Sequence, residues 1–101
     1  KAKKKISIDK YYMARIARVS TDAAQGVITG PGSNTVRADG KKVSIERDRV
    51  AGHGDSPHSA PSLTSNYSNS VFADGKKVAK SGTVATCGHT VSPGSGTVEV
   101  P

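Results

Sequence analysis

The sequence has 101 residues, of which 34% are hydrophobic, and it contains one Phe, three Tyr and no Trp. A chain of this size forms one domain with a small apolar core, and such domains often need a disulfide or a metal as a staple. Because there is only one cysteine, an internal disulfide is excluded as that staple. Eleven Gly and five Pro favour turns and short strands over helices, so we expect an all-β fold.

The net charge of +7 is concentrated at the N-terminus. Residues 1–12 hold five Lys and one Asp, a charge of +4, whereas residues 13–101 hold ten basic and seven acidic residues, a charge of +3. We expect residues 1–12 to form a basic tail or leader and residues 13–101 to form the folded domain. No apolar stretch of signal-peptide length follows the lysines, so no signal peptide is expected, and no run approaches the length of a membrane span.

An internal repeat organises the chain after the basic segment. Residues 34–43, Asn-Thr-Val-Arg-Ala-Asp-Gly-Lys-Lys-Val, recur 35 positions later as Asn-Ser-Val-Phe-Ala-Asp-Gly-Lys-Lys-Val at 69–78. An Asp-Gly pair between two short strands is the strongest local hairpin signal, because both turn residues need positive φ. We therefore predict two short β-hairpins, one in each copy of the repeat.

A third copy of the repeat is split between the two ends of the chain. Residues 93–98, Pro-Gly-Ser-Gly-Thr-Val, match residues 31–36, Pro-Gly-Ser-Asn-Thr-Val. Residues 15–19, Arg-Ile-Ala-Arg-Val, resemble the returning strand Lys-Val-Ala-Lys at 77–80. We predict that the two chain ends pair, which would give three short hairpin units around a pseudo-threefold axis.

All the histidines and the only cysteine lie in two of the three connectors between these units, and they are His53, His58, Cys87 and His89. One thiolate and three imidazoles form a complete tetrahedral ligand set for zinc, or for ferrous iron. With a one-residue insertion in the first copy, the alignment of the repeats sets His53 level with Cys87, as a metal shared by repeats would require. We therefore predict one metal ion, zinc or else iron, with the connector loops gathered around it. The alternative is three surface histidines and a buried thiol.

These features resemble the PAAR-repeat family, the metal-binding tip proteins of contractile injection spikes. The resemblance rests on the repeated Asn-x-Val-x-Ala-Asp-Gly-Lys-Lys-Val and on Cys-Gly-His in a following loop, and it covers about residues 13–101. It implies a small cone of β-hairpins whose metal lies near its point. The family's ligands would be carried here by His53, His58, Cys87 and His89. The Pro-Ala-Ala-Arg element that names the family is changed to Lys-Val-Ala-Lys at 77–80.

The resemblance implies a structural role in which the protein caps a trimeric β-helical spike, one copy per trimer, and sharpens it for membrane penetration. The spike would be a phage central spike or a VgrG-like protein of type VI secretion, and contact with the target membrane would be transient. The protein would lie on the virion at the tip of the tail baseplate spike, or in the bacterial cytoplasm before secretion. The sequence does not identify its partner-binding residues. No catalytic residues are expected, because four protein ligands close a zinc site and neither a G-x-S-x-G nor an H-E-x-x-H motif is present.

The alternative function is a small metal-stapled module that binds nucleic acid through its Lys-rich tail. Against it, the sequence has few aromatic residues to stack on bases and no basic helix to enter a groove. The sequence therefore favours the spike tip over nucleic acid as a partner, and both the phage and the type VI branch stay open.

Overall fold

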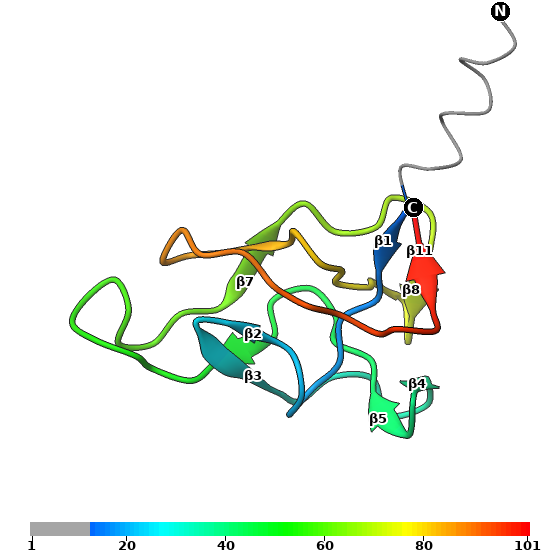
Figure 1. The fold of residues 1–101 in the computed structure, drawn as a ribbon, viewed down its shortest axis with the longest axis horizontal. Helices are drawn as coiled ribbons and strands as arrows, with labels where there is room; N and C mark the ends of the chain where they lie inside the picture. Colours follow the sequence, from blue (N-terminus) through cyan, green and yellow to red (C-terminus); the bar gives the residue numbers. More distant parts are fainter. Residues whose placement is uncertain (1–12) are drawn as a thin grey trace, which may run out of the picture.

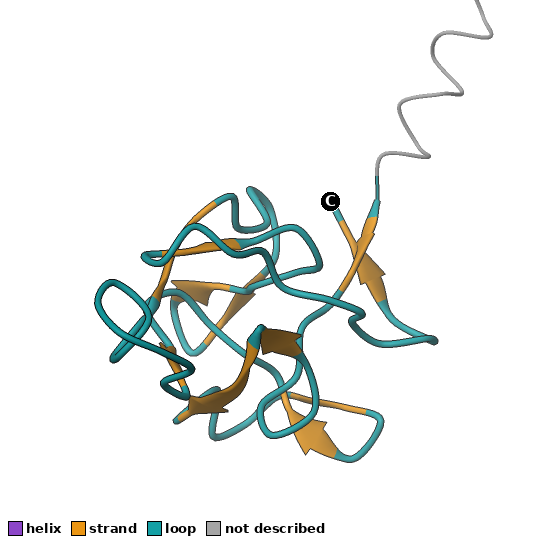
Figure 2. Cartoon of the chain, turned by 60° about the vertical axis from the view of Figure 1, so that its left-hand side comes forward, coloured by secondary structure: helices purple, strands orange, loops and turns teal. Residues whose placement is uncertain are grey.

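The computed structural model describes residues 13–101, so the predicted basic tail of residues 1–12 lies outside the described residues. The described part of the chain forms short strands and contains no helix, which confirms the predicted all-β class. None of these residues therefore forms a helix that could cross a membrane. Figure 2 shows these strands joined by loops and turns throughout. In order, the strands are β1 (Ala14–Arg15), β2 (Ala23–Ala24), β3 (Gly26–Gly30), β4 (Arg37–Ala38), β5 (Lys41–Lys42), β6 (Arg49–Val50), β7 (Leu63–Ser65), β8 (Phe72–Ala73), β9 (Lys76–Lys77), β10 (Val84–Ala85) and β11 (Glu99–Val100).

Both predicted hairpins are present. Strand β4 pairs antiparallel with β5, and β8 pairs in the same way with β9. Their turns hold Asp39 at φ 56° and Asp74 at φ 55°, and the following Gly40 and Gly75 both have φ 79°. Two successive residues with positive φ are typical of type I′ turns, whose twist matches that of the flanking strands. The Asp-Gly pairs therefore determine both hairpins locally.

The two ends of the described chain pair with each other, as the split third copy predicts. Strand β1 runs antiparallel to β11, with Ala14 opposite Val100 and Arg15 opposite Glu99. Figure 1 shows this pair far from the loop that carries residues 52–60, drawn in green. The chain ends thus supply the third two-stranded unit beside the two hairpins.

Three segments, one from each unit, are joined by a closed ring of backbone hydrogen bonds. The Ala17 N–H donates to the Ala79 carbonyl at 3.0 Å, the Ala79 N–H to the Ser44 carbonyl at 2.9 Å, and the Ser44 N–H to the Ala17 carbonyl at 2.9 Å. All three residues have no exposed surface, so each buried N–H group finds the partner that burial demands. The returning strands of the three sequence copies therefore meet in a cycle. The threefold arrangement of the whole chain and its conical outline stay predictions.

The 35-residue period continues into the turns that follow the returning strands. The Asp48 N–H donates to the Ile45 carbonyl at 3.1 Å, and 35 positions later the Thr83 N–H donates to the Lys80 carbonyl at 2.9 Å. The side chain of Asp48 accepts the Ile45 N–H, and the Thr83 hydroxyl accepts the Lys80 N–H. The two turns are thus built alike, with different side chains in the accepting position.

This register corrects one expectation from the sequence. The equivalent turns place Val50 of β6 level with Ala85 of β10, and both residues are buried. No insertion is needed, so His53 lies level with Gly88, one position beyond Cys87. The predicted equivalence of His53 and Cys87 is therefore wrong. The sequence comparison paired Val50 with another valine, whereas the hydrogen-bonded turns set it level with Ala85.

Buried apolar side chains form two clusters, one for each part of the fold. The cluster within the hairpin units contains Ile16, Ala38, Val43, Ile45, Ala73, Val78 and Val100. The second cluster lies among strands β2, β3, β6, β7 and β10 and contains Ala17, Val19, Ala24, Ile28, Val50, Leu63, Ala79, Ala85 and Val91, with Tyr67 and Cys87 packed against it. Most members are Ala or Val, so each cluster removes little apolar area from water.

The turn of each hairpin is tied to another unit by its aspartate. The Asp74 carboxylate accepts hydrogen bonds from the Ser33 hydroxyl at 2.7 Å and the Thr35 hydroxyl at 2.5 Å. The same arrangement recurs in the other hairpin, whose carboxylate and hydroxyl donors are Asp39, Ser95 and Thr97. These donors lower the pKa of both aspartates below the ordinary value, because they stabilise the ionised form.

Candidate metal centre

Two loops carry the four predicted ligands, and we call them the ligand loops, residues 52–60 and residues 86–90. The first follows β6 and leads toward β7, and the second follows β10. Glycine residues, which have little steric restriction, let both loops turn sharply. Gly54 adopts φ 151° and Gly88, between Cys87 and His89, adopts φ 92°. Positive φ at Gly88 costs little because glycine has no Cβ, and it keeps the thiol and the imidazole close together.

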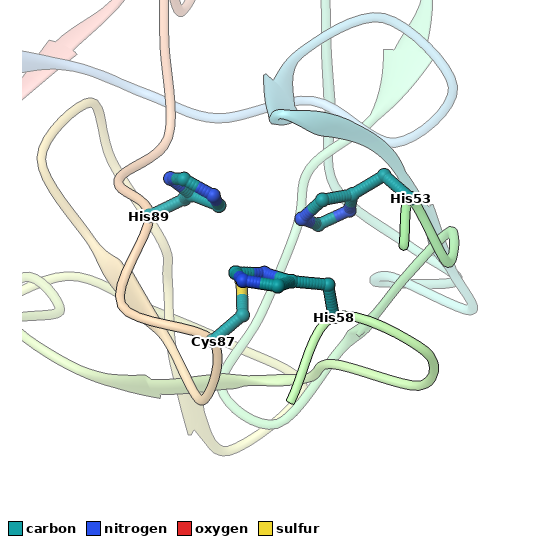
Figure 3. A group of neighbouring side chains, drawn as sticks. All are labelled: His53, His58, Cys87 and His89. Atoms are coloured by element: carbon teal, nitrogen blue, oxygen red, sulfur yellow. The ribbon is translucent and has the colours of Figure 1, made fainter. Parts of the chain in front are cut away.

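The structure brings all four predicted side chains to one place. Their ligand atoms, one from each residue, lie within 4.8 Å of one another, and all four residues are half-buried. The three imidazole rings have centroid separations of 5.1, 5.3 and 5.1 Å. Figure 3 shows the rings and the thiol converging from the two loops, with the residues labelled as His53, His58, Cys87 and His89.

Hydrogen bonds set the orientation of the first imidazole. His53 Nδ1 lies 3.1 Å from the carbonyl oxygen of Ala51, so this nitrogen carries the proton and donates it. The other ring nitrogen, Nε2, is then left with a free lone pair, which is the form that binds a metal. An imidazole held in this way cannot rotate without losing its bond to the backbone.

Two ring nitrogens of the cluster have no partner in the described part of the chain. They are Nε2 of His53 and Nδ1 of His58, and both are buried. A buried polar atom without a hydrogen bond costs about 1–3 kcal/mol. Their position inside a group of one thiol and three imidazoles fits a metal ion, which would accept a lone pair from each nitrogen.

Backbone hydrogen bonds hold each ligand loop in shape without help from the ligand atoms. In the first loop, the His53 N–H donates to the His58 carbonyl at 2.8 Å, and the His58 N–H donates to the Asp55 carbonyl at 2.7 Å. In the second, the Ala85 N–H donates to the His89 carbonyl at 2.9 Å. Asp55 therefore acts as a turn residue through its backbone, and it does not belong to the group of ligand atoms.

The second ligand loop is also joined to the segment that directly follows the first. The Thr86 N–H donates to the Ser62 carbonyl at 2.8 Å, and the Ser62 N–H donates back to the Thr86 hydroxyl at 3.2 Å. These bonds extend the pairing of β7 with β10 toward the ligands. The position of Cys87 relative to His58 is thus set by a continuous hydrogen-bonded connection.

The first connector supplies no ligand, as its lack of His and Cys predicts, but it supports the site through Gly26. A Cβ atom on Gly26 would overlap the carbonyl oxygen of Ala51 and lie 2.9 Å from His53 Nδ1. The residue must be glycine for β3 to pass this close to the first ligand loop. Sequence reasoning missed this position, because one glycine among eleven carries no signal of its own.

The chemistry of the cluster suits a closed structural site. Zinc takes four ligands in a tetrahedron, with Zn–N and Zn–S bonds of about 2.0–2.3 Å, so its ligand atoms lie about 3.3–3.8 Å apart. The present separations of up to 4.8 Å need side-chain movements of about 1 Å to meet this. Four protein ligands would leave no open position for water or a substrate.

Comparison with known proteins agrees with the geometry. The family model described as PAAR motif matches residues 18–93, a range that includes both ligand loops and two of the three units in full. A search of curated proteins gives no match. Residues of the sequence beyond the matched range include β1 and β11, which form the third unit.

Proposed function

The chain belongs to the PAAR-motif family, and from this membership we propose that it caps the tip of a trimeric β-helical spike. Proteins of this family are structural proteins associated with the spikes of contractile injection systems, which are phage tails or type VI secretion machines. The observation that carries the capping role is the ring through Ala17, Ser44 and Ala79. The ring itself is buried, but it joins three similar units around one centre, and three such units could match the three chains at the end of a spike.

The second part of the proposal is a metal ion held by the ligand loops. Its ligands are His53, His58, Cys87 and His89, with zinc as the first candidate and iron as the second. Three supports are the convergence of four ligand atoms, the two buried nitrogens without partners, and the hydrogen bond that fixes the tautomer of His53. The bound ion would cross-link the two loops and would supply no reaction chemistry.

Metal analysis tests this part directly. We expect about one equivalent of zinc plus iron in the purified protein, and less than about half an equivalent contradicts the site. The variant Cys87→Ala removes the only thiolate and should lose most of the metal. Thr90→Ala in the same loop is the matched control, because Thr90 is exposed and offers no ligand atom.

The proposed mechanism is mechanical. A contracting sheath would supply the force, and the protein's task is to remain narrow and stiff. Loops with little buried apolar surface would splay under load, and ligands from both loops at one ion remove that freedom. The Asp-Gly turns keep the hairpins short. A protein used in this way acts once and needs no turnover.

The partner surface should lie on the hairpin units. In each unit the carbonyl of Arg15, Lys42 or Lys77 already accepts an N–H group from a neighbouring unit. The other strands, β4, β8 and β11, pair on one side only, and such edges invite continuation by a partner's β-structure. Phe72 of β8 adds an apolar side chain that is 54% exposed. We expect one copy of this protein for each spike trimer.

Native mass measurement of the complex with the spike protein encoded in the same system tests the capping role. A mass equal to three spike chains plus one copy supports it. Three copies per trimer would contradict it, and so would the absence of any stable complex between this protein and the spike. Loss of the metal in Cys87→Ala should weaken penetration more than assembly, which separates the two parts of the proposal.

A further inference from the structure

Two adjoining cavities open on the surface of the molecule, and none of the four predicted metal ligands lines either of them. The larger has a volume of about 520 Å³, and hydroxyl and guanidinium groups line it, from Thr29, Arg47, Arg49, Ser59 and Ser62. Three of its lining residues are hydroxyl-bearing side chains and two are arginines, which together are the groups that proteins use to bind phosphate. Residues 59 and 60 of the first ligand loop form part of its wall.

The second cavity continues the first across β3. It has a volume of about 430 Å³ and shares Thr29 with the larger cavity, and its cationic residues are Arg37, Lys41 and Lys42. Together the two cavities are lined by five of the ten basic residues in 13–101. No carboxylate lines either of them. The concave surface is therefore cationic, in a part of the chain whose charge is only +3.

The arginines of the larger cavity are not used to hold the fold together. Within residues 13–101 the ion pairs join Arg18 to Asp22 at 3.0 Å and Arg18 to Asp39 at 2.9 Å, and none involves Arg47 or Arg49. Their guanidinium groups also donate no hydrogen bond to a described residue, whereas Arg18 donates several. Five N–H donors on each guanidinium group thus remain available to a ligand.

The backbone at Arg47 favours glycine, yet it carries an arginine. Arg47 has φ 70°, and the equivalent position 35 residues later is Gly82, with φ 97°. A side chain in this left-handed region costs about 1–2 kcal/mol. The Tyr67 hydroxyl accepts the Arg47 N–H at 3.1 Å, and burial raises the pKa of Tyr67, so the hydroxyl stays neutral and adds no negative charge there. In the other two copies this position is Gly82 and Ser20, the latter at φ 65°. The backbone therefore does not itself require arginine, which leaves the guanidinium available to a ligand.

We propose that these joined cavities bind phosphate groups, with Arg47 and Arg49 as the main ligands in the larger cavity. Each cavity has the size of a small ligand or headgroup, and Thr29, Ser59 and Ser62 add hydroxyl donors that can complete the contacts around phosphate oxygens. No aromatic residue lines either cavity, so the stacking platforms of single-strand nucleic-acid sites are missing there. The chemistry fits a lipid headgroup or free phosphate. This site needs neither a spike partner nor a metal.

The first experiment uses the full-length, metal-loaded protein and follows its backbone amides by NMR. Inorganic phosphate is added at constant ionic strength, with chloride as the replaced anion. We expect saturable shifts of the amides of Thr29, Arg47, Arg49 and Ser62. In parallel, the protein is sedimented with vesicles of phosphatidylglycerol in phosphatidylcholine, and with pure phosphatidylcholine vesicles. Shifts without sedimentation identify free phosphate as the source, and sedimentation with the mixed vesicles identifies the lipid headgroup.

A pair of charge-matched variants decides whether these cavities are responsible. Arg47→Gly with Arg49→Gln removes two charges, and the glycine suits the backbone, so the fold should persist. Lys76→Gln with Lys77→Gln removes two charges from the β8–β9 hairpin, outside both cavities. Loss of two charge-assisted contacts should weaken binding by about tenfold or more in the first pair. The second pair should stay within about twofold of the wild type, as expected for screened surface charges.

Three results would overturn the proposal. Equal weakening in both variant pairs would mean that the basic tail or overall charge attracts the anions. The absence of both amide shifts and vesicle sedimentation in the wild type would mean that the cavities bind no phosphate. Duplex DNA that binds more tightly than either phosphate source, with the loss confined to the arginine variants, would make this a nucleic-acid surface instead.

Discussion

The hairpin units and the ligand loops keep their shape by different means. The units around Ala17, Ser44 and Ala79 are joined by a ring of backbone hydrogen bonds and surround a cluster of buried apolar residues. In contrast, no residue of 52–60 or 86–90 is buried. The loops have hydrogen bonds, and of their residues only the half-buried Cys87 packs against a buried apolar cluster. A chain with so little apolar volume can order its hairpins by repetition, but it needs a cross-link to order the two ligand loops.

The largest expected effect comes from removing that cross-link. Structural zinc contributes on the order of 10 kcal/mol, which is comparable to the total stability of a small domain. Cys87→Ala, or chelation of the wild type, should therefore lower the melting temperature steeply, whereas Thr90→Ala should not. Hydrogen exchange then shows where order is lost. We expect protection to disappear first in residues 86–90 and 52–60. Equal and simultaneous loss in the hairpins would show that the two regions do not differ in this way.

The next effect concerns the contact between β3 and the first ligand loop. Gly26→Ala would place a methyl group against the Ala51 carbonyl and His53 Nδ1. Overpacking against backbone costs about 1–3 kcal/mol, and we expect weaker metal binding in addition, because His53 must move. Chemical denaturation and competition with a chelator measure the two effects. Gly96→Ala is the matched control, since a Cβ there meets no atom within 4 Å. A Gly26→Ala protein as stable as this control contradicts the close packing.

Much of the hairpin region could be predicted from the sequence because its signals are local. Asp39-Gly40 and Asp74-Gly75 specify their turns within two residues, and the split repeat predicts that its two halves pair, as β1 and β11 do. The convergence of the four ligands could also be predicted, because they are all the His and Cys residues in the chain.

Features that depend on contacts between distant residues could not be predicted. Gly26 matters only because residue 51 lies against it, and Ser33 matters only because Asp74 approaches it. The register of Val50 with Ala85 was also missed, since the sequence offers a better valine match one position away. Such features follow from the packing of the units, which a local pattern does not specify.

A smaller effect should appear in acid, in the hairpin region. Threonine and serine donors lower the pKa of Asp74 in the folded state. The ionised carboxylate therefore stabilises the fold above the ordinary pKa of 3.8. This stabilisation is lost as the pH falls through the lower pKa of the folded state. Asp74→Asn should therefore flatten the fall in unfolding free energy below about pH 4. Denaturant unfolding from pH 2 to pH 6 measures it. Metal release in acid affects both proteins and cancels in their difference. Parallel curves for the two proteins would contradict the role of the Ser33 and Thr35 hydroxyls.

The smallest expected effect on stability concerns two equivalent positions of the repeat. Arg47 and Gly82 occupy equivalent left-handed positions, so the same backbone should respond in opposite directions to opposite changes. Gly82→Ala should cost about 1 kcal/mol, because a Cβ is disfavoured at this φ and the reduced entropy of the unfolded chain offsets only part of that cost. The space itself is open, since the nearest atom to a Cβ on Gly82 is Asn66 Nδ2 at 3.5 Å. Arg47→Gly should leave the unfolding free energy unchanged or raise it by up to about 1 kcal/mol. Chemical denaturation at one pH measures both variants. A marked loss of stability in Arg47→Gly would mean that the arginine side chain supports the fold, and the argument that it is kept for a ligand would then fail.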